Sequence, residues 1–186
     1  ASSARVRRVL GFFFRPKREV LRANAHGARA GTAKLGPSGQ WLVPPTPTEE
    51  LFAGVWQSRI TCHTCGYQSD KFEPLMDLSL EVDSKLTSVG VSLCYMARKE
   101  EMRGDTAYSC PVCAKLVEAT KQMTLHRTPN CAVITLKRFD ENLLKFSDDV
   151  VFPRELDLSP FLSPSSVEVE ARFGLYGVLY HRGSSP

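Results

Sequence analysis

Two cysteine pairs with the same spacing constrain this chain more than any other feature. Cys62 and Cys65 enclose two residues, and so do Cys110 and Cys113. Two residues between cysteines allow a tight turn to direct both sulfur atoms at one ion, and a structural zinc site takes four such ligands. We therefore predict one zinc ion bound by all four cysteines. The 44 residues between the pairs require a fold larger than a compact zinc ribbon.

Other interpretations of the six cysteines fit less well. A redox pair or buried thiols do not explain two equal pairs flanked by turn-forming residues. A disulfide framework suits a small secreted domain, but the sequence shows no signal-peptide pattern and no apolar run long enough to span a bilayer. Cys94 and Cys131 stand alone, and we expect both to be buried structural thiols. His63, inside the first pair, is expected at the surface.

The charge is uneven along the 186 residues. Residues 1–34 carry a net charge of +8 and the remainder carries −4. Apolar residues interleaved with arginines predict short amphipathic helices on both sides of Pro16, and the Gly-, Ala- and Pro-rich stretch that follows predicts a linker. We therefore divide the chain into a basic, Gly/Pro-rich extension and linker over residues 1–48 and a folded body over residues 49–186.

The body is predicted to be mostly β. Alternating and β-branched residues predict strands at 55–61, 75–82, 121–125, 131–139 and 175–180, with one helix at 89–98. The strand at 75–82 has an apolar face and a polar face, because neighbouring side chains of a strand point in opposite directions. The polar face carries Asp77, Ser79 and Glu81.

The order of several motifs resembles one family. Residues 52–65 (FAGVWQSRITCHTC) are similar to F-x-G-x-x-x-S-x-I-x-C-x-x-C, and residues 69–80 (SDKFEPLMDLSL) to S-x-x-x-E-P-F-x-D-L-S-L. Residues 104–113 (GDTAYSCPVC) are similar to G-x-N-x-Y-x-C-x-x-C, and LKRF and LYGVLYHRG follow at 136–139 and 175–183. Together these motifs resemble the ubiquitin-specific proteases, a family of papain-like deubiquitinases.

The resemblance implies an α+β fold shaped like a hand. It implies mostly antiparallel β fingers with a four-cysteine zinc ribbon and part of a β-rich palm, with the thumb largely absent. It also implies that ubiquitin is the partner, with its C-terminal tail passing between thumb and palm. Asp77 and Glu73 are expected to bind ubiquitin, Asp77 through the arginine-rich tail. The resemblance further implies an intracellular protein of the cytoplasm or nucleus.

The residues that would cut ubiquitin are not found in this sequence. The family hydrolyses the bond at ubiquitin's C-terminal glycine with a cysteine, a histidine and an Asp or Asn. Residues 1–51 contain no cysteine and no match to the family's G-L-x-N-x-G-N-T-C-Y box. His181 matches an H-x-G motif that precedes the catalytic G-H-Y box, and His26 and His126 have no identifiable cysteine partner. We therefore predict no catalytic residues here and a deubiquitinase fragment that is inactive alone.

Two alternatives remain. The chain is either part of a longer enzyme or a non-catalytic ubiquitin-binding zinc-finger module or scaffold. A nucleic-acid-binding zinc ribbon is disfavoured, because residues 35–186 carry a net charge of −4 and the cysteine region lacks a basic, aromatic stripe. We expect neither a nucleic acid nor a membrane as partner.

Overall fold

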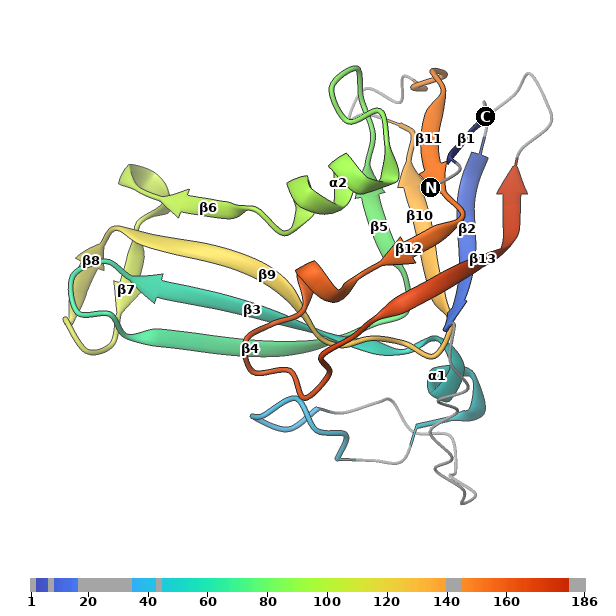
Figure 1. The fold of residues 1–186 in the computed structure, drawn as a ribbon. Coiled ribbons are helices and arrows are strands. Elements are labelled where there is room, and N and C mark those ends of the chain that lie inside the picture. The colour runs from blue at the N-terminus through green and yellow to red at the C-terminus, as the bar shows by residue number, and fades with distance from the viewer. Residues whose placement is uncertain (1–2, 7–8, 17–34, 43–44, 140–144, 181–186) are drawn as a thin grey trace.

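The computed structural model describes residues 3–6, 9–16, 35–42, 45–139 and 145–180. Strands predominate, and the two helices are short (Figure 1). The elements in chain order are β1 (Ser3–Val6), β2 (Val9–Pro16), α1 (Pro47–Phe52), β3 (Gly54–Cys62), β4 (Gln68–Leu75), β5 (Leu78–Glu81), α2 (Val89–Met96), β6 (Lys99–Met102), a 3₁₀ turn (Gly104–Thr106), β7 (Tyr108–Cys110), β8 (Lys115–Val117), β9 (Ala119–Arg127), β10 (Ala132–Lys137), β11 (Val150–Pro153), β12 (Glu155–Asp157), a second 3₁₀ turn (Ser159–Phe161) and β13 (Arg172–Tyr180).

A four-stranded antiparallel sheet forms the elongated part of the molecule, which we call the fingers. Its strand order is β4-β3-β9-β6, and Figure 1 shows it extending away from the remaining strands. β3 pairs along its length with β4 on one side and β9 on the other. The strands predicted at 55–61 and 121–125 are confirmed, and both are longer than predicted. The hairpin of β7 and β8 lies at the far end of this sheet.

A five-stranded sheet forms the second part, which we call the palm. Its order is β12-β13-β2-β10-β5, and only the β10–β5 pair is parallel. β1 pairs with β11 as a separate two-stranded sheet. Most of the hydrophobic core lies here, including the fully buried Leu78, Leu80 and Ile134. The strands predicted at 131–139 and 175–180 correspond to β10 and β13.

The strand β2 corrects the interpretation of the N-terminal segment. The interleaved pattern predicts a helix on each side of Pro16, but residues 9–16 form a strand between β10 and β13. The helix predicted after Pro16 lies outside the described residues. Phe12 and Phe14 are fully buried, and the Phe12 ring lies 4.5 Å from that of Phe152, measured between centroids. Gly11 is needed for close packing, since a Cβ atom there would lie 2.8 Å from the Ile134 carbonyl oxygen. The segment over residues 1–48 is therefore not only an extension, although the boundary at residue 48 stays a prediction.

The strand β5 and the helix α2 lie side by side at the junction of fingers and palm. Leu78 and Leu80 of β5 are buried while Ser79 is exposed, as the alternation predicts, but Met76 lies in a bend before the strand and is 43% exposed. The Ser88 hydroxyl caps α2 by accepting a hydrogen bond from the Val91 N–H at 3.1 Å. Within the described residues, no helix has the length and hydropathy needed to cross a membrane.

Candidate functional site: a cysteine cluster and an acidic pocket

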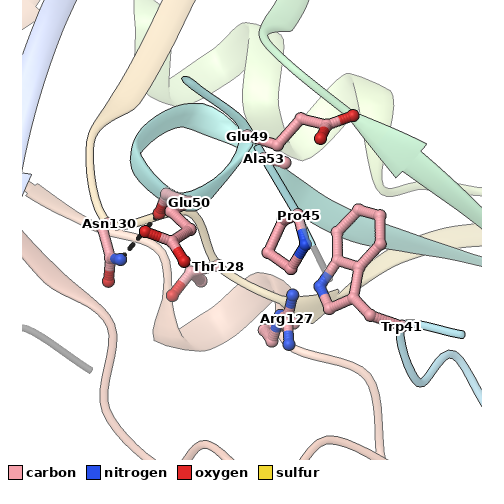
Figure 2. Close-up of a pocket in the computed structure, with 8 residues that line it drawn as sticks. All are labelled: Trp41, Pro45, Glu49, Glu50, Ala53, Arg127, Thr128 and Asn130. Atoms are coloured by element: carbon pink, nitrogen blue, oxygen red, sulfur yellow. Dashed lines mark hydrogen bonds between the residues drawn. The ribbon is translucent and has the colours of Figure 1, made fainter. Parts of the chain in front are cut away.

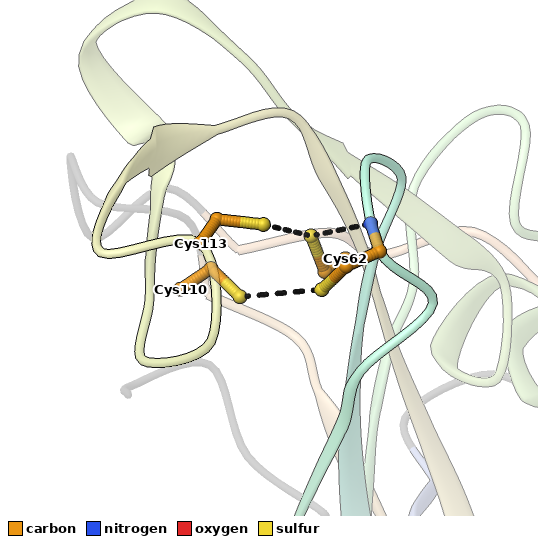
Figure 3. A group of neighbouring side chains, drawn as sticks. Cys62, Cys110 and Cys113 are labelled. Carbon is orange, nitrogen blue, oxygen red and sulfur yellow. Dashed lines mark hydrogen bonds between the residues drawn. The ribbon is translucent and has the colours of Figure 1, made fainter.

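The structure brings the four paired cysteines together at the tip of the fingers (Figure 3). Cys62 ends β3 and Cys110 ends β7, and each strand then turns back through the second cysteine of its pair. Cys62 and Cys110 are buried, whereas Cys65 is exposed. The two pairs are separated in the sequence by 44 residues, which include β4, β5, α2 and β6. The predicted grouping of Cys62, Cys65, Cys110 and Cys113 is therefore present in the fold.

The distances between the sulfur atoms match those of a tetrahedral metal site. The Sγ atoms of Cys62 and Cys113 are 3.9 Å apart, those of Cys65 and Cys110 are 3.7 Å apart, and all four lie within 4.8 Å of one another. Zinc–sulfur bonds of about 2.3 Å in a tetrahedron place the sulfurs about 3.8 Å apart. The four thiols could therefore hold one metal ion.

The two turns have the same backbone conformation. The N–H groups of Gly66 and Ala114 donate to the carbonyl oxygens of Cys62 and Cys110 at 3.0 and 2.9 Å. Both residues have positive φ angles, of 73° and 52°. This left-handed conformation suits the glycine but is strained in an alanine.

The backbone of the Cys62–Cys65 turn also affects the pKa of a cysteine thiol. The N–H of Cys65 hydrogen-bonds to the Cys62 sulfur at 3.5 Å, and this contact is the largest of several hydrogen bonds that together lower the pKa of the Cys62 thiol to about 6. Hydrogen bonding to the Cys65 sulfur raises the pKa of Cys113 to about 12. The cluster thus favours one thiolate, and a bound cation would favour the others.

The remaining cysteines and His63 lie outside this cluster. His63 is exposed, as predicted, and its Nε2 lies 2.6 Å from the Thr120 hydroxyl. Cys94 was predicted to be buried, but it is exposed on α2. Cys131 is partly buried, and this burial raises the pKa of its thiol. Neither sulfur has a histidine as hydrogen-bond partner among the described residues.

A pocket of about 300 Å³ lies where fingers, palm and α2 meet. Its charged lining is more acidic than basic, with three carboxylates and two cations. Asp77 belongs to this lining, and its Oδ2 accepts a hydrogen bond from the Ser79 hydroxyl at 2.8 Å. The lining residues are Trp56, Asp77, Ser79, Glu81, Ser92, Tyr95, Met96, Arg98, Glu100, Met123 and Lys137.

Glu73, the second residue expected to bind ubiquitin, is not part of the pocket lining. It lies on β4, opposite Trp56 of β3, and its carboxylate contacts the Lys71 amine at 2.5 Å. Glu73 therefore lies on β4 and Asp77 in the bend between β4 and β5, and the two predicted residues do not share one cavity.

A second, smaller pocket of about 50 Å³ lies between α1 and the end of β9 (Figure 2). The Arg127 guanidinium lies 5.1 Å from the Trp41 ring centroid, and Asn130 donates to the Glu50 carbonyl at 2.8 Å. A space of this size holds only a few water molecules. It therefore offers no room for a peptide or nucleotide.

Two β sheets that meet at an acidic pocket, with four clustered cysteines at the tip of one sheet, define a zinc-ribbon-like fingers-and-palm protein. The sequence model of the family described as ubiquitin carboxyl-terminal hydrolase matches residues 36–186. The chain belongs to this family, which includes the ubiquitin-specific proteases.

Curated relatives support the assignment. The chain is 33% identical over 152 residues to ubiquitin carboxyl-terminal hydrolase 15 of Arabidopsis thaliana, covering 81% of this chain and 16% of the relative. It is 38% identical over 139 residues to ubiquitin carboxyl-terminal hydrolase 25 of the same plant, covering 74% of this chain and 21% of the relative. With hydrolase 42 of Homo sapiens it shares 36% identity over 136 residues, covering 72% and 10%. The chain thus spans a quarter or less of each of these relatives.

Solved structures are similar as well. One is the SAGA DUB module of Ubp8, Sgf11, Sus1 and Sgf73 bound to monoubiquitin, with a TM-score of 0.57, 30% identity and coverage of 62% of this chain and 27% of that chain. The same module bound to ubiquitin aldehyde has a TM-score of 0.59 and 24% identity, with coverage of 72% of this chain and 33% of that chain. At this identity the similarity supports the fold alone.

Proposed function

We propose that this chain binds ubiquitin through the pocket that contains Asp77, as part of a deubiquitinase that hydrolyses the bond at ubiquitin's C-terminal glycine. The single observation that carries the proposal is the placement of Asp77 in an acidic, aromatic-lined pocket between the two sheets. The similar module of known structure is described as bound to monoubiquitin.

The chemistry of the pocket suits an arginine-bearing tail. Asp77, Glu81 and Glu100 supply carboxylates, and a charge-assisted hydrogen bond to a guanidinium is about twice as strong as a neutral one. Trp56 and Tyr95 supply aromatic faces, which attract cations and cover apolar side chains. Glu73, on the neighbouring strand β4, is proposed as a weaker contact outside the pocket.

Hydrolysis requires residues other than those described. A thiol protease needs a cysteine close to a histidine, and no described cysteine has one as a hydrogen-bond partner. We propose that the described region binds ubiquitin without cleaving it, and that four cysteines hold a structural zinc ion at the fingertip. The alternative of a non-catalytic ubiquitin-binding module makes the same binding prediction. The two hypotheses differ in whether the natural protein turns over a fluorogenic ubiquitin substrate.

Binding of fluorescently labelled ubiquitin, followed by anisotropy, tests the proposal. Asp77→Asn should weaken binding about tenfold or more, since hydrogen bonds to charged groups contribute about 1.5–3 kcal/mol. Asp105→Asn is the matched control, because it removes the same charge from an exposed turn outside the pocket. Ubiquitin without its C-terminal tail should bind weakly to both variants. Equal affinities of the two variants for intact ubiquitin would exclude Asp77 as a contact.

A further inference from the structure

Arg98 lies two residues after the end of α2, on the wall of the acidic pocket. Its Nη2 atom is 3.1 Å from Oε1 of Glu100, and its Cζ atom lies 3.5 Å from the centroid of the Tyr95 ring. Its Nη1 atom donates a hydrogen bond to the Tyr95 carbonyl oxygen at 2.7 Å. One guanidinium is therefore bound by a carboxylate, an aromatic face and a backbone carbonyl.

These three groups form the kind of site that recognises arginine. A carboxylate accepts charge-assisted hydrogen bonds from the planar guanidinium, and the aromatic face attracts its positive charge. Tyr95 and Glu100 line the same pocket as Asp77 but belong to the α2–β6 segment, whereas Asp77 lies in the bend just before β5. The pocket thus has two separate places where a cation can bind.

We propose that Tyr95 and Glu100 form a second arginine subsite, and that Arg98 occupies it in competition with an arginine of the bound partner. The proposal rests on the proposed function of the pocket and adds a residue that sets its affinity. Arg98 is a tethered occupant, so an incoming arginine must displace it before both subsites can be used.

The contacts of Arg98 permit this displacement. The side chains of Arg98 and Glu100 are 41% and 48% exposed, and exposed ion pairs of this kind contribute little to stability. The guanidinium can therefore leave the subsite without disturbing the core. When it leaves, or when a neutral residue replaces it, the described part of the lining has three carboxylates and one cation, Lys137.

The first test compares two neutralising variants of the full chain. Arg98→Gln should bind ubiquitin about 3–10-fold more tightly, because the competing cation is gone. Arg103→Gln is the matched control, since it breaks a similar exposed ion pair, between Arg103 and Glu101 at 3.1 Å, outside the pocket. Both variants change the net charge equally, so a gain caused by long-range attraction would appear in both. An equal gain in the two variants, or no gain in Arg98→Gln, overturns the proposal.

A second test does not depend on ubiquitin. N-acetyl-arginine amide titrated into Arg98→Gln should shift the NMR ring signals of Tyr95, and the wild-type protein should need at least several-fold more of this probe for the same shift. Adding Glu100→Gln to Arg98→Gln should remove the shift. If the wild type and Arg98→Gln need the same concentration of N-acetyl-arginine amide for the same shift of the Tyr95 signals, the subsite is contradicted. A shift in Arg98→Gln without ubiquitin binding by any variant would support the subsite and count against the proposed function. Circular dichroism and zinc content confirm that each variant is folded.

Discussion

Gly66 and Ala114 occupy equivalent positions in the two cysteine turns. Each follows the second cysteine of its pair, each has a positive φ angle, and each donates its N–H to the carbonyl of the first cysteine. The same left-handed backbone conformation is thus adopted by Gly66, whose residue type favours it, and by Ala114, whose residue type does not.

Exchanging these residue types should move stability in opposite directions. An L-residue in the left-handed region lowers the stability of the folded state by about 1–2 kcal/mol relative to glycine. Alanine offsets about 0.4–1 kcal/mol of this, because its unfolded chain has less conformational entropy to lose than that of glycine. We expect Ala114→Gly to raise the free energy of unfolding by about 0.5–1 kcal/mol and Gly66→Ala to lower it by a similar amount. Urea unfolding with saturating zinc measures both. Destabilisation by Ala114→Gly would show that the alanine is not strained.

Purified protein should contain one zinc ion per chain. Cys110→Ser should abolish this stoichiometry, because the remaining three sulfurs no longer complete the tetrahedron. It should also lower the melting temperature, since metal binding stabilises the turns that it connects. Cys94→Ser is the control, as Cys94 is exposed on α2 and lies outside the cluster. Mass spectrometry of the metal content and a chelator titration measure the outcome, and clearly less than one zinc in the wild-type chain would contradict the site.

The partly buried His126 should make the protein less stable in mild acid. Burial lowers its pKa, as does the charge of Arg127, although Glu168 and Asp70 act in the opposite direction. The folded state therefore favours neutral imidazole. The resulting stability is complete above the unfolded pKa of about 6.5 and is lost as the pH falls through the lower folded value.

Replacing His126 isolates this contribution. His126→Gln should flatten the dependence of the unfolding free energy on pH between about 5 and 8, measured by urea unfolding. His63→Gln, which changes an exposed histidine, is measured beside it as the comparison variant. Because zinc release also depends on pH, both variants are compared at the same saturating zinc concentration. Identical pH profiles for His126→Gln and the wild type would exclude His126 as their source.

The palm should depend strongly on β2. Phe12→Ala should lower the free energy of unfolding by about 3–5 kcal/mol, the range for removing a large buried aromatic side chain. Arg15→Ala, on the same strand but exposed, should change it by less than about 0.5 kcal/mol. Urea unfolding and hydrogen exchange of β10 amides test this. Normal stability of Phe12→Ala would contradict the placement of β2 in the core.

Local patterns were sufficient for part of this structure. The cysteine spacing predicted the cluster because each turn is specified by neighbouring residues. The alternation around Leu78 predicted the buried face of β5 for the same reason. The prediction that Cys94 is buried is wrong, since the residue is exposed. The buried residues Val89, Ser92 and Leu93 follow helical spacing, and Cys94 lies one position beyond that stripe.

Other features depend on residues far apart in the sequence. The partners of β2 are β10 and β13, so whether the segment around Phe12 forms a strand is decided by residues far from it in the sequence. The family match begins at residue 36, after β2 ends, and the family motifs therefore do not cover it either. The contact of Arg98 with Tyr95 depends on the path of the backbone after α2. The amino-acid composition does not indicate this path.

The position of β2 also determines the order in which the palm can assemble. Phe12 pairs with Ile134 and with Val178, so β2 must wait for two partner strands that are synthesised much later than itself. Pairings between distant segments form slowly, because the chain loses loop entropy before the contacts stabilise it. During synthesis the Phe-rich segment would remain without its partner strands until β10 and β13 have been made. We therefore expect the palm to fold late and slowly, and its unpaired Phe-rich strand to need protection by chaperones until then.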